Sequence, residues 1–207
     1  MPLAVSLSRS KPVAIAGAQV VLRAPVAADF EPWARLRHDS RNFLRPWEPT
    51  WASDELSKEA FRRRLRRYSQ AARDGTGHIF FVFDKKAGAL VGGCQLSNIR
   101  QGGAQSAATL GYWMGERFAG KGLMTDAVTT LTRYCLTKLG LHRIEAACLP
   151  DNVASRRVLA KAGFVEEGIA RQYLKINGHW RDHLLFAIIE DDPPVARPPK
   201  GEVFQRG

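Results

Sequence analysis

The chain of 207 residues lacks the features that define several large classes of protein. No apolar run approaches the roughly 20 residues that a membrane-spanning helix needs, which excludes a transmembrane protein. Cysteine is scarce: Cys94, Cys135 and Cys148 show no metal-ligand spacing. We therefore interpret them as small buried residues of a protein in the reducing cytoplasm, not as a disulfide framework. Disorder throughout is also excluded, because 5 Trp, 10 Phe and 4 Tyr can build a core.

Acidic residues are outnumbered, since 31 Lys and Arg against 20 Asp and Glu give a net charge of +11. Such a charge favours anionic partners: nucleic acid, a ribosome or a phosphorylated cofactor. The N-terminus also lacks the order of a secretory signal, because Arg9 and Lys11 follow its apolar patch. We expect a flexible leader over residues 1–18, one domain over residues 19–191 and a proline-rich tail over residues 192–207, in the cytoplasm and without a membrane partner.

The hydrophobic period changes from strand-like to helical and back along the domain. Strands are expected at residues 20–22, 78–83, 89–97, 107–114, 143–149, 171–176 and 180–189. Helices are expected at residues 27–38, 53–72, 125–139 and 152–162. A loop must separate the first two helices because it contains Pro46 and Pro49, and Asn177-Gly178 indicates a type I′ hairpin turn. The order predicts an α+β domain with a central β-α-β crossover.

The hexapeptide Arg117-Phe118-Ala119-Gly120-Lys121-Gly122 lies between an expected strand and a long helix. Glycines at this spacing allow a tight turn that points successive N–H groups inward, and the positive end of the helix dipole adds to them. The segment therefore suits a pyrophosphate. It lacks the Gly-Lys-Ser/Thr of a Walker loop and the third glycine of a dinucleotide fingerprint. A plain strand-to-helix turn explains these six residues equally well.

This loop and several other motifs resemble the GNAT-type N-acetyltransferases, and among them the RimJ/RimL branch, which acetylates N-termini of ribosomal proteins; the RimJ type is closest. The resemblance covers about residues 20–190. Its segments are Phe43-Leu44-Arg45-Pro46-Trp47-Glu48-Pro49, Gly111-Tyr112-Trp113, Gly120-Lys121-Gly122-Leu123-Met124, His142-Arg143-Ile144, Asn152-x-x-Ser155, Gly163-Phe164 and Gly178-His179-Trp180-Arg181-Asp182-His183.

The resemblance implies the GNAT, or acyl-CoA N-acyltransferase, fold: a mixed, mostly antiparallel seven-stranded sheet flanked by about four helices. It also implies an enzyme that transfers acetyl from acetyl-CoA, without a metal, by direct attack of a primary amine on the thioester. The expected amine is the N-terminal α-amine of a protein, in particular a ribosomal one. Two alternatives stay open: a small amine or antibiotic as acceptor, and a ribosome- or RNA-binding assembly factor.

The resemblance also assigns the cofactor site. It places the CoA pyrophosphate on the loop of Arg117, Gly120, Lys121 and Gly122. It pairs the pantetheine arm with the strand residues Tyr112, Trp113 and Met114, where a bulge would free an N–H for the thioester oxyanion.

Two residues at the start of the fourth helix complete the implied CoA site. Asn152 would hydrogen-bond the pantetheine arm, although it also suits a helix N-cap. Ser155 would protonate the leaving thiolate; the alternative is a first-turn serine satisfied by backbone. Many GNAT enzymes have an acidic Tyr four residues before the Gly-Phe pair, and here Leu159 takes that position.

The general base has two candidates, Glu48 in the Pro-Trp-Glu-Pro loop and Glu145 on the strand leading to Asn152. Each is equally explained as a surface or salt-bridged carboxylate. Trp47, Trp51 and Glu48 would line the acceptor groove, or the two tryptophans would only anchor the loop to the core. A weak base suits an α-amine, with a pKa of about 7.7–8.0, better than a lysine at about 10.4.

Five arginines, residues 62, 63, 64, 66 and 67, crowd the second helix. A solvated face is the ordinary explanation of such a run; contact with ribosomal RNA through Arg62, Arg63 and Arg66 is the functional one. His179 and His183 are four residues apart but have no Cys or acidic ligands beside them, so we expect no metal.

Overall fold

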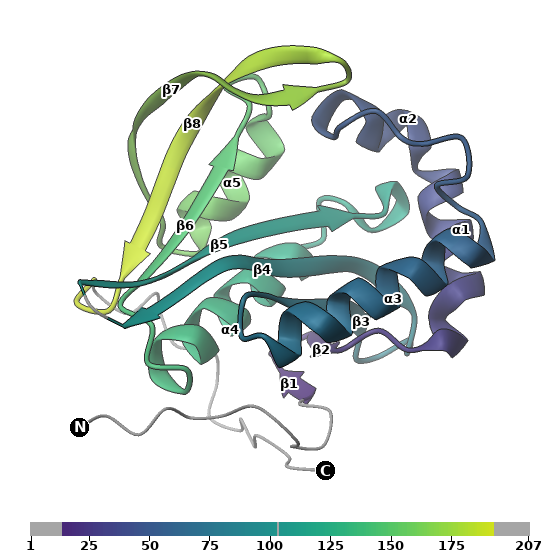
Figure 1. The fold of residues 1–207 in the computed structure, drawn as a ribbon, viewed down its shortest axis with the longest axis horizontal. Helices are drawn as coiled ribbons and strands as arrows, with labels where there is room; N and C mark the ends of the chain where they lie inside the picture. Colours follow the sequence, from purple (N-terminus) through teal and green to yellow (C-terminus); the bar gives the residue numbers. More distant parts are fainter. Residues whose placement is uncertain (1–13, 103, 193–207) are drawn as a thin grey trace.

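The computed structural model describes residues 14–102 and 104–192; most of the expected leader and tail lies outside these residues. One sheet has the strand order β1-β2-β3-β4-β5-β6-β8-β7, with helices on both faces (Figure 1). The strands are β1 (Ala14–Ala16), β2 (Val20–Arg23), β3 (His78–Asp84), β4 (Leu90–Gly102), β5 (Gln105–Met114), β6 (Arg143–Cys148), β7 (Val165–Ile176) and β8 (His179–Ile189). The α-helices are α1 (Phe30–Asp39), α2 (Arg41–Leu44), α3 (Lys58–Arg73), α4 (Leu123–Thr137) and α5 (Val153–Lys161).

The sheet is mixed and mostly antiparallel, as expected: among the described strands only β5 and β6 pair in parallel. The helix α4 makes the crossover between these two, which a parallel pair requires. The described sheet has eight strands instead of seven. The additional strand is β1, which lies within the stretch assigned to the leader.

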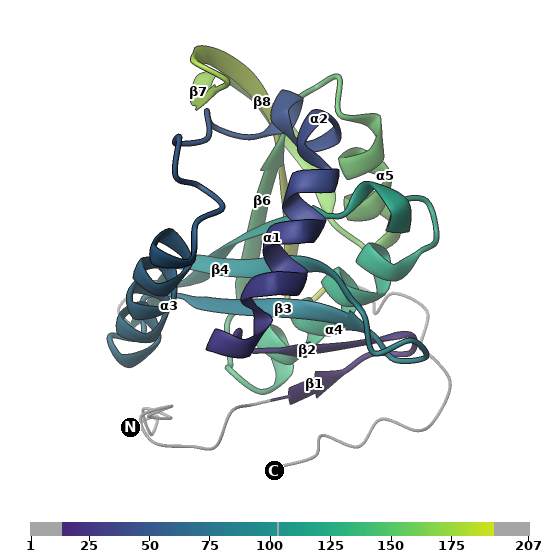
Figure 2. The same ribbon diagram turned by 90° about the vertical axis from the view of Figure 1, so that its right-hand side faces the viewer.

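Two hydrophobic clusters hold the layers together. The larger one packs α4 and α5 against the sheet, with Val128, Leu131 and Leu159 fully buried. The smaller one packs α1 and α3 on the other face around Trp33 and Phe61, whose ring centroids are 4.9 Å apart. Figure 2 shows α1 and α3 on one side of the sheet and α4 and α5 on the other.

Several expected boundaries were wrong; strand β7, for example, begins at Val165 instead of residue 171. Helix α3 begins at Lys58 instead of residue 53, because the Ser57 side chain accepts a hydrogen bond from the Ala60 N–H and caps the helix there. Strand β4 continues to Gly102 through the turn expected at residues 100–103, with an irregularity in its pairing with β5 at Asn98, whose φ is +51°. The described part of the chain contains no helix long and apolar enough to cross a membrane.

The hairpin of β7 and β8 turns at Asn177-Gly178, as predicted. Their φ angles are +45° and +86°, the left-handed pair that a type I′ turn needs. The tip of this hairpin lies over the segment that follows α2, because the Asn177 N–H donates to the Glu48 carbonyl at 3.0 Å. Two segments far apart in the sequence thereby enclose one end of the sheet.

Candidate active site

Strands β5 and β6 separate before either of them ends. Their parallel pairing runs only from Ala107↔Arg143 to Leu110↔Ala146. Beyond it, β5 continues to Met114 against β4, while β6 continues to Cys148 against β8. The two strands visibly diverge in Figure 1. The edge of β5 at residues 112–114 is therefore open to a ligand that pairs as a strand would.

Strand alternation tells which backbone groups face this gap. The Gly115 N–H donates to the Val91 carbonyl at 2.9 Å, so Gly115 and Trp113 direct their polar backbone groups toward β4. Tyr112 and Met114 consequently direct theirs toward the gap. The bulge expected here was wrong, because the β4–β5 register is continuous from Gly92↔Met114 to Ser97↔Thr109. The N–H groups are free because the neighbouring strand has turned away.

A pair of hydroxyl groups spans the gap. The Tyr112 hydroxyl lies 2.8 Å from the Ser155 Oγ and 3.2 Å from the Ser155 carbonyl oxygen, to which it can only donate. Burial raises the pKa of Tyr112 well above its usual value, against the opposing effect of the Ser155 hydrogen bond. The Cys148 thiol lies against the same serine; burial raises its pKa although the Ser155 hydrogen bond acts to lower it. Tyr112 therefore stays protonated at neutral pH and can donate.

Asn152 holds Ser155 in place. Its side-chain oxygen accepts the Ser155 N–H at 3.0 Å, so Asn152 is the N-cap of α5. The nitrogen of the same amide has no hydrogen-bond partner among residues 14–102 and 104–192, and it remains able to donate to a ligand. Leu159, which stands where many GNAT enzymes have a tyrosine, is fully buried in the core.

The loop before α4 has the geometry of an anion site. Gly120 and Gly122 have φ angles of +76° and +79°, and Gly122 is the N-cap of α4 without a side-chain cap. Within the described chain, the N–H groups of residues 120–125 meet no acceptor. The side chains of Arg117 and Lys121 both lie over the Phe118 ring, 4.8 and 5.7 Å from its centroid. Unpaired N–H groups at a helix N-terminus beside two cations fit a pyrophosphate.

Glu48 belongs to a cluster that the sequence did not reveal. Both its carboxylate oxygens accept from the Arg37 guanidinium at 2.7 Å, and one also accepts from the Trp51 Nε1 at 2.7 Å. The Arg37 side chain is 8% exposed and lies over the rings of Trp51 and Trp113. This carboxylate is therefore salt-bridged, as the alternative interpretation of Glu48 had it.

Glu48, Trp51 and Trp113 line a cavity of about 520 Å³ on the α1–α3 face, which we call the aromatic cavity. Its wall also includes Tyr112, whose hydroxyl reaches Ser155. A Cβ at Gly93 would come within 2.6 Å of the Trp113 Nε1, so this glycine leaves room for the indole. The cavity thus borders strand β5 at Tyr112 from the face opposite α4 and α5.

The second base candidate lies elsewhere. Ile144 and Ala146 of β6 are buried against the α4 face, so Glu145 points to the other side of the sheet from α5. Its carboxylate pairs with Arg143 at 3.0 Å and Arg100 at 3.3 Å. The structure does not bring Glu145 to Ser155.

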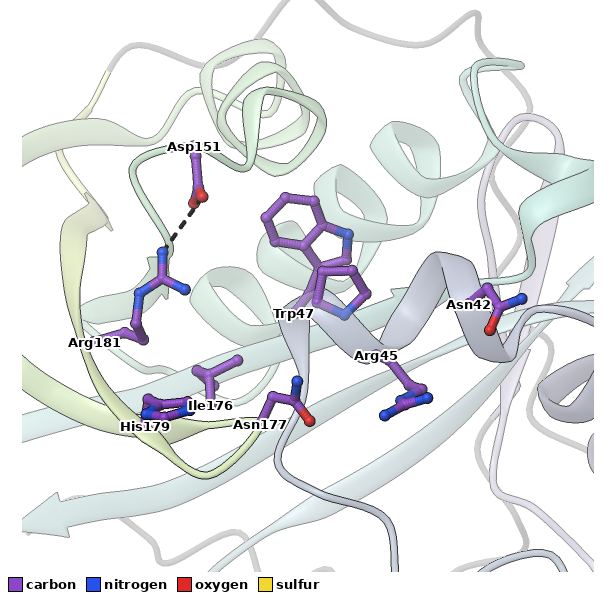
Figure 3. A pocket seen from close by; sticks show the side chains of 9 residues that line it. Asn42, Arg45, Trp47, Asp151, Ile176, Asn177, His179 and Arg181 are labelled. Atoms are coloured by element: carbon purple, nitrogen blue, oxygen red, sulfur yellow. Dashed lines mark hydrogen bonds and ion pairs between the residues drawn. The ribbon is translucent and has the colours of Figure 1, made fainter.

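Trp47 lines a second cavity of about 400 Å³, which we call the hairpin pocket (Figure 3). Its lining residues are Asn42, Arg45, Pro46, Trp47, Asp151, Ile176, Asn177, His179 and Arg181. The Trp47 indole lies in the middle of this view, with Arg181 and Asp151 on one side and Arg45 on the other. Arg181 pairs with Asp151 at 3.4 Å.

The two histidines considered as metal ligands lie in different environments, one buried and one exposed. His183 is buried, with its Nδ1 2.9 Å from the Arg181 carbonyl oxygen, whereas His179 is exposed at the hairpin pocket. Among the residues with described positions, no group of three or more His, Cys, Asp or Glu could hold a metal ion.

Several residues of the site escaped sequence reasoning. Arg37 and Cys148 were not assigned to it, and Tyr112 was expected to act through its backbone alone. Trp51 was considered with Trp47 as a wall of the acceptor groove, and it lines the aromatic cavity. The side chains of Arg37 and Tyr112 contact residues of other elements, and no local sequence pattern predicts such contacts.

The chain resembles proteins of known family. Residues 19–165 match the acetyltransferase (GNAT) domain. The probable N-acetyltransferase YjcK of Bacillus subtilis is 36% identical over 176 residues, which cover 85% of this chain and 97% of that protein. The ribosomal protein uS5 alanine N-acetyltransferase of Escherichia coli is 36% identical over 154 residues, 74% of this chain and 79% of that one. Mycobacterium smegmatis RimJ, in complex with CoA-disulfide, superposes with a TM-score of 0.80 at 34% identity, over 89% of this chain and 88% of that chain.

Proposed function

The chain belongs to the GNAT acetyltransferase family, and on that premise we propose that it transfers acetyl from acetyl-CoA to the N-terminal α-amine of a protein, specifically a ribosomal one. The expected fold and enzyme class are confirmed by the relatives. The observation that carries the proposal is the Tyr112–Ser155 hydroxyl pair beside the open edge of β5. A ribosomal acceptor would place the reaction in the cytoplasm.

The CoA moiety is assigned to the gap and the glycine loop. Its pyrophosphate would accept from the N–H groups of residues 120–125, with Arg117 and Lys121 supplying positive charge. The pantetheine arm would pair with the free edge of Tyr112 to Met114, and the Asn152 amide nitrogen would donate to it. The residues present therefore fit this co-substrate, which supplies the activated acetyl group.

The chain's own groups serve both stages of the transfer. As the amine attacks, a backbone N–H on the open edge of β5 stabilises the negative charge on the thioester oxygen. As the carbon–sulfur bond breaks, the Ser155 hydroxyl donates to the thiolate, and Tyr112 holds that hydroxyl in place. The amine loses one proton and the thiolate gains one, so the overall reaction needs no external acid.

The state of Glu48 supports an α-amine as the acceptor. With its oxygens bound by Arg37 and Trp51, this carboxylate is better suited to holding the cavity wall than to removing a proton. Glu145 points to the face opposite α5. An amine that is partly neutral near pH 7.5 needs only water as the base; a lysine at a pKa of about 10.4 needs a stronger one.

Electrostatics disfavours the alternative of a small polyamine. The two carboxylates that line the aromatic cavity, Glu48 and Glu55, pair with Arg37 and Arg64. The hairpin pocket carries Arg45 and Arg181. Neither cavity therefore offers the surplus of negative charge that would attract a polycation.

Helix α3 supports a second role beside catalysis, contact with ribosomal RNA. Arg62 and Arg66 are exposed and have no ion-pair partner in the described chain, while Arg63 pairs with Asp54. We propose that this face binds phosphate through Arg62, Arg63 and Arg66 and brings the enzyme to its acceptor.

The deciding experiment measures thiol release from acetyl-CoA with a panel of acceptors. The panel contains peptides that begin with Ala, Ser or Met, a peptide with a blocked N-terminus and one lysine, and small polyamines. We expect turnover of free N-termini and none of the blocked peptide. Turnover of polyamines alone would replace the proposal by the small-amine alternative. If the protein binds acetyl-CoA but acetylates none of these acceptors, the alternative of a ribosome- or RNA-binding assembly factor would be favoured.

A further inference from the structure

The hairpin pocket is lined by residues that directly precede active-site residues in the sequence. Trp47 precedes Glu48 of the aromatic cavity, and Asp151 precedes Asn152, which caps Ser155. Asp151 directly precedes Asn152, the N-cap of α5, and Ser155 lies in the first turn that follows. An extended peptide advances about 3.3 Å per residue. A chain whose amine lies near Ser155 therefore reaches this pocket within about its first four residues.

The lining of the pocket carries more positive than negative charge. Arg45 is exposed and makes no hydrogen bond or ion pair with any described residue. Arg181 meets Asp151 only at 3.4 Å, in a pair whose side chains are 43% and 62% exposed. His179 lines the pocket beside them. A planar guanidinium without a partner is the donor that a carboxylate matches best.

We propose that the hairpin pocket binds an acidic side chain at about the second to fourth position of the acceptor peptide. This inference rests on the proposed function and names the feature by which the enzyme selects among N-termini. The carboxylate accepts from Arg45 and Arg181, and the Trp47 indole packs against the methylene groups of the same side chain (Figure 3).

A peptide explains this pocket better than nucleic acid does. The two arginines lie in one recess that the Asn177–Glu48 backbone contact adjoins, not along a continuous groove. A strand of nucleic acid is tracked by a row of cations with aromatic residues for stacking. A chain of net charge +11 repels a uniformly basic acceptor. An acidic residue near the N-terminus of the acceptor would reduce this repulsion.

The test compares octapeptides that share an N-terminal Ala and differ at the third position, which is Asp, Asn or Lys. The measurement is kcat/KM for each at low ionic strength. We expect the Asp peptide to exceed the Asn peptide about fivefold to tenfold, as suits a partly exposed pair of charges. Repetition with Asp at positions 2, 4 and 7 locates the contact; position 7 should give no preference.

Charge variants then assign the preference to the pocket. In Arg45→Glu the order should reverse, with the Lys peptide above the Asp peptide. In Asp151→Asn the preference for Asp should increase, because Arg181 loses its competing partner. Lys86→Glu is the matched control: it makes the same change of charge at an exposed turn and makes no contact with the pocket.

Each outcome decides the inference separately from the proposed function. Equal turnover of all three peptides overturns the acidic subsite and leaves Nα acetylation standing. Loss of the preference in Lys86→Glu as well overturns it too, because a general field and not the pocket would then be responsible. Absence of turnover on every peptide contradicts the proposed function itself.

Discussion

Two hydroxyl groups share one hydrogen bond at the reactive end of β5, and their environment decides which way protons move. Burial raises the pKa of Tyr112, so its hydroxyl remains a donor throughout the physiological range. When it donates to the Ser155 Oγ at 2.8 Å, the proton of the Ser155 hydroxyl is left free to be donated to a thiolate in the gap. The pair therefore acts mainly after the thioester has begun to break.

Ser155→Ala should consequently lower kcat about 100-fold while leaving the affinity for acetyl-CoA nearly unchanged, because general-acid catalysis typically contributes that much and acts in the transition state. Steady-state kinetics and equilibrium binding of acetyl-CoA measure the two effects. Ser69→Ala, on the exposed face of α3, is the matched control. An unchanged kcat in Ser155→Ala would remove this hydroxyl from the mechanism.

The ion pair of Arg37 and Glu48 should matter more for stability than for proton transfer. Glu48→Gln leaves a guanidinium that is 8% exposed without its anion, which typically costs about 3 kcal/mol of unfolding free energy. Urea unfolding measures this loss. The double variant Arg37→Met/Glu48→Gln should regain most of it, because no charge is then buried.

The same variants separate positioning from catalysis. If Glu48 only holds Arg37 and Trp51, Glu48→Gln raises the KM for the peptide and leaves the pH profile of kcat/KM in place. Loss of the acidic limb of that profile would show instead that Glu48 is the general base.

Tyr112 should also make the protein less stable in alkali. Its folded-state pKa lies above the unfolded value of about 10, so the folded state holds a proton that the unfolded state releases above that pH. The associated stability is present below pH 10 and decreases above it, by up to about 1.4 kcal/mol per pH unit. Unfolding of Tyr112→Phe between pH 9 and 11 should show a smaller slope than the wild type; equal slopes would contradict this.

At the residue level, sequence reasoning found groups that a motif marks and missed those that meet only in three dimensions. Ser155 and Asn152 lie in one short motif, and the structure places both beside the gap. The absence of a tyrosine at Leu159 directed attention to Ser155, whose role stays a prediction. Its partner Tyr112 is 43 residues away on strand β5, and this contact depends on the divergence of β5 and β6.

Among the elements, the turn from β5 into α4 depends on backbone conformation more than on side chains. Gly122 has a φ of +79° at the N-cap of α4. Gly122→Ala should weaken CoA binding at least about tenfold, because an L-residue would be strained by roughly 1 kcal/mol and its rearrangement would turn the N–H groups away from the pyrophosphate. Isothermal titration with CoA measures the affinity.

Gly88→Ala is the control for this prediction. Gly88 has a φ of +65° and open space where a Cβ would lie, but it belongs to the β3–β4 turn. The Gly88→Ala variant should lose about as much unfolding free energy as Gly122→Ala and keep the wild-type affinity for CoA. Equal loss of CoA affinity in both variants would mean that strain alone, not the loop, is responsible.

Element types were predictable where the hydrophobic period was long, and boundaries were not. Helix α4 and the β7–β8 turn satisfied a local rule and were found. Strand β1 was missed because it is three residues long and is held by distant groups: the Asp126 carboxylate at the start of α4 accepts from the N–H groups of Ala18, Gln19 and Val20 in the adjoining turn and strand. Such tertiary contacts override weak local preference.

For the whole molecule, the net charge of +11 acts through its distribution. Arg37 and Arg64 neutralise carboxylates within the aromatic cavity. Arg117 and Lys121 flank the loop before α4, and four exposed arginines, residues 62, 63, 66 and 67, lie on α3. That helix packs against β3, away from the gap between β5 and β6 (Figures 1 and 2).

This arrangement predicts that RNA binding and catalysis can be separated. The triple variant Arg62→Ala/Arg63→Ala/Arg66→Ala should bind ribosomal RNA more weakly, with the slope of log K against log salt smaller by about 2–3, because about 0.7–0.9 counterions are released per phosphate contact. Its kcat/KM on a short peptide should not change. Filter binding at several salt concentrations measures the slope.

The control for the helix is the triple variant Lys86→Ala/Lys161→Ala/Arg171→Ala, which removes the same charge from exposed positions on other elements. It should keep the wild-type slope. If both variants lose RNA affinity equally, the overall charge and not α3 holds the RNA. If the wild type fails to bind RNA even at low salt, the arginines of α3 are an ordinary solvated face, and the enzyme must find its acceptor through the peptide alone.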